Sequence, residues 1–175
     1  ALGMLNLMNS DKETENYEFT IKSKPDEVVA LLTSKSADIA AVPTNLAATL
    51  YNKNSSVKLL ALNTLGVLYV LEKGDTIQSV KDLKGKTIYS TGQGAVPEYA
   101  LNYVLEQNGL TVGKDVTVEY KTEHTELAAL MAADKASVAV LPQPFVTTVT
   151  SANADVRVAL DLTKEWENVN HTTLT

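Results

Sequence analysis

An internal repeat constrains the fold of this chain more than any other feature of the sequence. Shifted by about 99 positions, Tyr17–Thr64 aligns with Val116–Thr163 over about 48 residues without a gap. The match is sharpest where Ala37–Pro43 (ADIAAVP) lies over Ala136–Pro142 (ASVAVLP). Convergent α/β patterning could produce such a match, but several elements keep one spacing, which favours duplication. The repeat therefore predicts two similar lobes with a connecting segment between them.

Each copy shows the pattern strand, helix, strand, helix, strand. Glu18–Lys22 and Val116–Lys121 alternate apolar and polar residues, which is typical of a strand. Ile39–Val42 and Val138–Leu141 are short apolar runs, which suit strands that are buried on both faces of a parallel sheet. The last segment of each copy, beginning at Val57 in the first, is a further apolar run.

Helices are expected between these strands. Ser23 and Asp26 have capping-box spacing ahead of an apolar stripe, and Thr122 stands where Ser23 stood in the first copy. Pro43 and Pro142 open loops that run into the next helices. Strands that alternate with helices predict a parallel, doubly wound sheet in each lobe.

The segment between the copies holds the best candidate for a ligand site. We predict Val67–Leu71 as the last strand of the first lobe and Thr87–Ser90 as the first strand of the second. The second of these strands runs into the glycine-rich turn Thr91–Ala95 (TGQGA) and then a helix over Glu98–Gln107. Such a turn leaves backbone N–H groups free beside the positive end of a helix dipole, where anions and carbonyl oxygens bind.

A tight turn whose glycines serve geometry alone is the competing interpretation of this segment. It lacks the third glycine of a dinucleotide fingerprint and the Gly-Lys-Ser/Thr of a P-loop. We favour ligand binding, because the turn follows the carboxyl end of a strand, where open α/β sheets place their ligands.

Composition excludes several classes of function. The net charge of −6 and the pI of about 4.9 disfavour nucleic acid as a partner. The chain has no cysteine, and neither His124 nor His171 has metal-ligand spacing with a partner, so we expect no metal and no cofactor. No apolar run reaches the roughly 18 residues that span a bilayer, and no signal segment opens the chain.

An ordered set of motifs resembles one family of proteins. The motifs are SVKDLKGKT at Ser79–Thr87, the GQGAVPEYAL that follows, ADIAAVP, and VLPQP at Val140–Pro144. Together they resemble ABC-transporter substrate-binding proteins, in the branch for nitrate, sulfonate, taurine and thiamine-precursor uptake. The resemblance covers nearly the whole chain and implies a type II periplasmic-binding-protein fold: two doubly wound α/β lobes that are joined by a hinge and close on a small solute.

The resemblance also implies lobe boundaries and missing ends. Family members have a strand and loop before the residue that matches Ala1 and a return into the first lobe after Thr175, so we expect a chain trimmed at both ends. The expected first lobe comprises residues 1–71 with 165–175 returning to it, and the second comprises 72–164. A lipoprotein or secretion signal would have lain upstream, which implies an extracytoplasmic, lipid-anchored or periplasmic protein.

In the family, the ligand cleft is lined by loops at the strand ends of both lobes. Leu65 and Gly66 lie near the expected hinge, and Thr44, Asn45 and Gln143 are about as well explained as helix caps. The ligand-binding residues that the resemblance implies are Pro43, Thr44, Asn45, Asn63, Thr64, Thr91, Gly92, Gln93, Gly94, Ala95, Glu123, His124, Gln143 and Pro144.

Three functions follow from this reading. The first is a monomeric, non-enzymatic solute-binding component that delivers a small polar, anionic or heteroaromatic solute to an ABC permease. The second is an enzyme of cofactor biosynthesis on the same fold, with His124 or Glu123 catalytic. The third is the ligand-sensing domain of a receptor or regulator.

Overall fold

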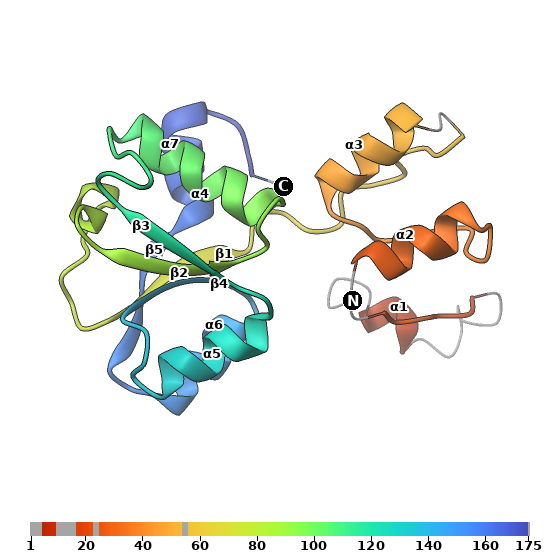
Figure 1. The fold of residues 1–175 in the computed structure, drawn as a ribbon. Coiled ribbons are helices and arrows are strands. Elements are labelled where there is room, and N and C mark those ends of the chain that lie inside the picture. Colours follow the sequence, from red (N-terminus) through yellow and green to blue (C-terminus); the bar gives the residue numbers. More distant parts are fainter. Residues whose placement is uncertain (1–4, 10–16, 23–24, 54–55, 175) are drawn as a thin grey trace. The chain divides into compact units, whose positions relative to one another are not determined.

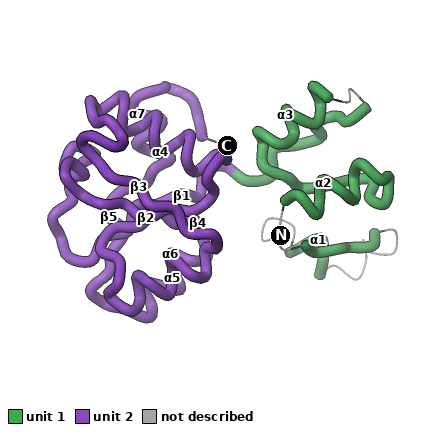
Figure 2. Tube along the Cα trace, in the orientation of Figure 1, with its two compact units in different colours: residues 1–64 green, residues 65–175 purple. Residues whose placement is uncertain are grey.

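The protein folds into two compact units, residues 1–64 and 65–175 (Figure 2). The computed structural model describes residues 5–9, 17–22, 25–53 and 56–174. The predicted helix cap Ser23 lies outside the described residues.

A five-stranded sheet forms the centre of the unit 65–175 (Figure 1). Its strands follow the order β3-β2-β4-β1-β5, with β2 parallel to β3 and β4, and β1 antiparallel to β4 and β5. Their bounds are β1 Leu68–Lys73, β2 Thr87–Thr91, β3 Thr117–Lys121, β4 Val138–Pro142 and β5 Val156–Asp161.

The prediction for Val67–Leu71 was wrong in one respect. We expected this strand at the end of the first lobe, but β1 lies inside the sheet of the unit 65–175, between β4 and β5, and runs antiparallel to both. Its nearly unbroken apolar sequence suits a central strand in either lobe, because apolar content reports burial on both faces and carries no information about direction. The predicted lobe ranges themselves stay a prediction.

Helices cover both faces of this sheet (Figure 1). On one face lie helix α4 (Val96–Gln107), helix α7 (Leu162–Asn170) and the short 3-10 helix η3 (Val80–Leu83). Leu101 of α4 and Leu162 of α7 belong to one apolar cluster. Leu127 of α5 (His124–Ala132) and Val146 of α6 (Phe145–Ala152) join the other. Adjacent residues of β1 and of β4 point alternately into the two clusters, which makes the unit a doubly wound α/β sandwich.

In the described part of the unit 1–64, the regular elements are helices. They are α1 Leu5–Met8, α2 Pro25–Thr33 and α3 Thr44–Lys53. Helix α2 and helix α5 have the same length and begin about 99 positions apart, which is the offset of the sequence repeat. The repeated order of elements therefore extends to the helices of this unit.

The strands predicted at Glu18–Lys22 and Ile39–Val42 are not assigned, although the backbone there is not helical. Their second-copy counterparts explain why. In the sheet, every hydrogen-bonded neighbour of β3, β4 and β5 is either β1 or β2, and both of these strands lie outside the repeat. The first copy thus repeats three strands that do not pair with one another, and no described residue of the unit supplies the strands between them.

Burial reflects the same difference. Ile39 is 62% exposed, whereas its counterpart Val138, in β4, is 3% exposed. Leu59 and Leu60, in the last segment of the first copy, are 70% and 74% exposed. These apolar side chains belong to segments with the composition of buried strands, but no neighbouring strand among the described residues of this unit covers them.

An ion pair between a buried carboxylate and a partly exposed guanidinium fixes the loop that follows β1. Glu72 is 2% exposed, and its Oε1 accepts hydrogen bonds from Thr76 N (2.9 Å) and Thr76 Oγ1 (2.5 Å). Its Oε2 accepts from Ile77 N (3.0 Å) and from Arg157 Nη2 of β5 (3.0 Å). Arg157 also donates to Gly74 O and Ile77 O, so one carboxylate and one guanidinium hold the whole loop.

Candidate ligand-binding site

The carboxyl ends of three adjacent strands meet at one edge of the sheet. Because β3, β2 and β4 are neighbours and run parallel, the segments that follow them lie together. These segments are Thr91–Ala95, Thr122–His124 and Gln143–Phe145, and we call them the strand-end edge. Of the residues predicted to bind ligand, the structure brings together those that belong to this unit.

Side chains connect the three segments. The Thr91 hydroxyl and His124 Nδ1 share a hydrogen bond of 2.6 Å, and the His124 ring lies 5.2 Å from the Phe145 ring between centroids. Thr91 is buried, so its hydroxyl is fixed in place. The edge therefore presents a polar group and an aromatic face that are held by packing, which is the combination that small-molecule sites use.

Burial lowers the pKa of His124 below its ordinary value of 6.5, although the charge of the neighbouring Glu123 acts in the opposite direction. The imidazole is consequently neutral at pH 7 and offers hydrogen bonds rather than a positive charge. Glu123 is the N-cap residue of α5, where its backbone oxygen accepts from Leu127 N at 3.2 Å.

The glycine-rich turn joins β2 to α4 in a left-handed conformation at two positions. Gly92 and Gly94 have φ of +73° and +76°, which side chains rarely adopt. A Cβ on Gly92 would also lie 3.1 Å from Pro97 Cγ, so this glycine serves both geometry and space.

The prediction that this turn leaves several backbone N–H groups free is only partly correct. Ala95 N–H donates to Gly92 O at 3.0 Å, and Gly94 N–H donates to Glu98 Oε2 at 2.5 Å. The protein's own carboxylate thus occupies a donor that a ligand anion would otherwise use.

Gln143 acts as a helix cap, the alternative that the sequence left open. Its Oε1 accepts hydrogen bonds from Thr147 Oγ1 at 3.0 Å and from Thr147 N at 3.4 Å. The peptide bond between Gln143 and Pro144 is cis, and Phe145 then begins α6.

The remaining predicted residues belong to the other unit. Pro43 immediately precedes α3, Thr44 and Asn45 begin it, and Asn45 Oδ1 is buried without a hydrogen-bond partner among the described residues. Asn63 and Thr64 are exposed and share a hydrogen bond of 3.2 Å. The boundary between the units follows Thr64. The hinge at Leu65 and Gly66 stays a prediction.

The sequence reasoning missed Phe145, which belongs to the edge, and also Glu98, which accepts a hydrogen bond from Gly94 of the edge, and Tyr120, which contacts Glu98. Glu98 lies in the first turn of α4, three residues after the N-cap residue Ala95, and this spacing is a sequence pattern that indicates capping. Tyr120 and Phe145 had no such pattern, since their role depends on contacts between elements.

Two cavities of this unit are lined by residues outside the three segments of the strand-end edge. One of about 240 Å³ lies at the opposite end of the strands, lined by Lys86, Thr87, Tyr89 and Lys135–Val138. Another, of about 210 Å³, is lined by Val96, Tyr99, Ala100, Trp166, Thr173 and Leu174.

The described residues contain no group of three or more His, Cys, Asp or Glu side chains placed to hold a metal ion. No described helix has the length and apolar character that crossing a membrane requires.

Comparison with known families identifies the chain. The family model for the periplasmic substrate-binding protein of phosphonate ABC transporters matches residues 4–169. The chain belongs to this family of ABC-transporter substrate-binding proteins, as the motifs indicated. A comparison with curated protein sequences gives no match.

Solved structures agree on the fold. An ABC transporter protein from Parabacteroides distasonis is 28% identical with a TM-score of 0.71, over 83% of this chain and 49% of that one. The periplasmic aliphatic sulphonate binding protein of Escherichia coli is 16% identical with a TM-score of 0.66, over 93% of this chain and 56% of that one. The ligand-binding component of an ABC-type import system from Staphylococcus aureus, with zinc bound, is 14% identical with a TM-score of 0.67, over 95% and 58%.

These neighbours have the type II periplasmic-binding-protein fold that the sequence predicted. This chain spans about half the length of each of the three.

Proposed function

We propose that this protein is the extracytoplasmic solute-binding component of an ABC importer and delivers a small polar or heteroaromatic solute to the permease. The observation that carries the proposal is the strand-end edge, where Thr91, His124 and Phe145 are held in contact at the carboxyl ends of three parallel strands. Membership of a substrate-binding family supports the same role.

The proposed site extends beyond this edge. Pro43, Thr44, Asn45, Asn63 and Thr64 contribute ligand contacts from the unit 1–64, and Leu65 and Gly66 act as the hinge. Ligand contacts from both units then favour a closed state, which commits the solute for transfer. The protein acts as a monomer, anchored by a lipid or free in the periplasm.

A panel of solutes tests the proposal through thermal unfolding. The panel comprises sulfonates, phosphonates, nitrate, bicarbonate, pyrimidines, amino acids and vitamins. A solute at about a hundred times its dissociation constant adds roughly 2.7 kcal/mol to the free energy of unfolding, which raises the midpoint by several degrees. A panel in which no compound moves the midpoint would contradict solute binding.

Two variants locate the binding once a solute is found. Thr91→Val removes the hydroxyl that contacts His124, and we expect it to weaken binding at least tenfold, because a buried polar contact would be lost. Thr87→Val makes the same change at the other end of β2 and should leave the affinity unchanged. Equal affinities in the two variants would place the site elsewhere.

Whether the protein converts the bound solute distinguishes transport from catalysis. A binding protein returns the solute unchanged, whereas an enzyme with His124 as its acid or base converts it and loses turnover in His124→Ala. Product that wild-type protein forms and His124→Ala does not would contradict the transport proposal.

A further inference from the structure

A carboxylate occupies the position at the start of α4 that an anionic ligand would take. Glu98 lies in the first turn of the helix, and its Oε2 accepts the Gly94 N–H at 2.5 Å. A helix N-terminus favours negative charge through its unpaired N–H groups and its dipole. Here the side chain of the protein already supplies that charge.

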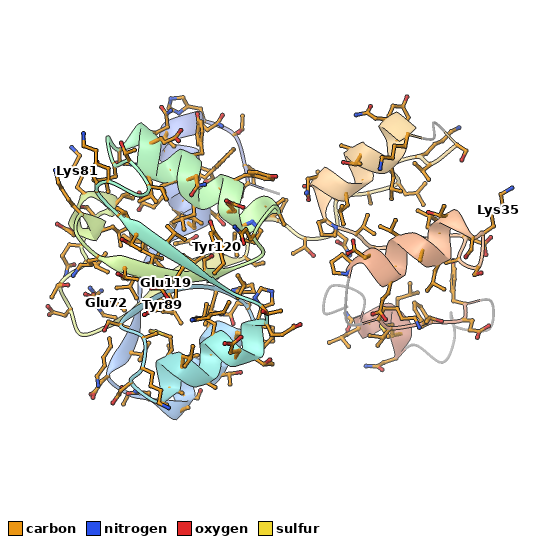
Figure 3. All side chains as sticks on the ribbon, viewed as in Figure 1. Lys35, Glu72, Lys81, Tyr89, Glu119 and Tyr120 are labelled. Atoms are coloured by element: carbon orange, nitrogen blue, oxygen red, sulfur yellow. The ribbon has the colours of Figure 1, made fainter. Side chains whose placement is uncertain are left out.

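Tyr120, which Figure 3 labels, places a second element against this carboxylate. It belongs to β3, beside Ser90 of β2. Burial, together with the charge of Glu98 and a hydrogen bond to it, raises the pKa of Tyr120 to about 12. The phenol therefore stays protonated and donates to Glu98, so the carboxylate is held from the turn and from a neighbouring strand.

The strand-end edge has no positive charge to offset Glu98. The segments Thr91–Ala95, Thr122–His124 and Gln143–Phe145 contain neither Lys nor Arg, and His124 is neutral. Glu123 adds a second carboxylate.

Lys121, the last residue of β3, is directed away from the edge. Its Nζ lies 5.3 Å from the centroid of the Tyr89 ring and 3.9 Å from Glu119 Oε2. Both of these residues stand two positions before the ends of their strands, toward the middle of the sheet.

We propose that Glu98 is a specificity-determining residue that makes this edge select a solute with a cationic nitrogen and reject phosphonates and sulfonates. The solute presents an ammonium, amidinium or protonated ring nitrogen to the free lone pairs of Glu98. Phe145, which lies against His124 in another segment of the edge, offers an aromatic face that suits a cation or a flat ring. The inference rests on the proposed solute-binding function and names the class of solute.

Two probes that share a phenyl ring and carry opposite charges test this assignment. Benzamidine carries a planar amidinium, and phenylphosphonate carries an anion on the same ring. Both are titrated into the ¹⁵N-labelled chain, and the Gly94 and Phe145 amide signals report binding at the edge. Glu98→Gln keeps the size and capping capacity of the side chain but removes its charge, and Glu106→Gln, at the other end of α4, is the matched control.

We expect wild-type protein and Glu106→Gln to bind benzamidine at least tenfold more tightly than phenylphosphonate, with the Gly94 and Phe145 signals moving. In Glu98→Gln, this preference should shrink at least tenfold or reverse. If the preference is the same in all three proteins, or if neither probe moves these signals, the assignment of Glu98 is overturned.

The solute panel separates this failure from that of the proposed function. A panel solute that binds with an affinity unaffected by Glu98→Gln would overturn the role of Glu98 and leave solute binding standing. An absence of binding by both panel and probes would overturn both.

Discussion

Replacing Glu72 by Gln should destabilise the protein by about 4 kcal/mol, because one carboxylate satisfies four donors. Thr76 supplies two of them, and Ile77 and Arg157 supply one each, at 2.5 to 3.0 Å. An amide keeps only one acceptor oxygen and turns an NH₂ group toward N–H donors. With hydrogen bonds to a charged group contributing about 1.5–3 kcal/mol each, the loss of two of them in a buried site gives this magnitude.

Urea denaturation, followed by circular dichroism, measures the change in the free energy of unfolding. At about 3 °C per kcal/mol for a chain of this size, the thermal midpoint should also fall by roughly 12 °C. Glu119→Gln is the matched control on β3, where the side chain is 49% exposed, and it should change stability by less than about 0.5 kcal/mol. Equal effects at both positions would refute the reasoning from burial and donors. Figure 3 labels both glutamates.

The pH dependence gives the same prediction a second readout. Burial raises the pKa of Glu72, but hydrogen bonds from Thr76, Ile77 and Arg157 outweigh it and hold the pKa below its ordinary value of 4.5. A lowered folded-state pKa means that the stabilisation is complete above pH 4.5 and is lost as the pH falls through the folded-state value. The difference between wild-type protein and Glu72→Gln should therefore shrink below about pH 4.5, and a difference that stays constant down to pH 2 would contradict it.

Two further predictions concern packing and strand pairing. Gly66→Ala should lower the free energy of unfolding by about 2–4 kcal/mol, because a Cβ there would lie 2.2 Å from Thr163 Oγ1. Adding Thr163→Ala should recover at least part of this loss in urea denaturation, and no recovery would show that this contact is not the cause. Amide hydrogen exchange should be at least about a thousandfold faster at residues 39–42 than at residues 138–141, since the first copy lacks neighbouring strands, and comparable protection would show that the first copy is paired.

Local pattern predicted much of the second unit. The period of its strands and helices was readable from the sequence. The family resemblance placed Glu123, His124 and Gln143 at strand ends, and in the structure they follow the strands next to the one that leads into Thr91–Ala95. The direction of β1 was not readable, because an apolar strand packs equally well in either direction and its neighbours come from distant parts of the chain.

The strands of the first copy show a different limit of sequence reasoning. Ile39–Val42 has the composition of a buried strand, and its counterpart β4 is one. The composition of a segment shows that it can form a buried strand if other strands lie beside it. The hydrogen bonds between strands in this sheet depend on β1 and β2, which the repeat does not include. The contact between Tyr120 and Glu98 could not be predicted from the sequence, because the two residues lie on different elements, β3 and α4, and meet only in the folded protein.

The most direct test of the account is the titration of the solute found in the panel into the ¹⁵N-labelled protein. We predict that the largest amide shifts fall at the strand-end edge, in Gly92–Ala95, His124 and Phe145. Shifts that concentrate instead around Lys86 and Lys135, at the cavity on the opposite end of the strands, would contradict the account.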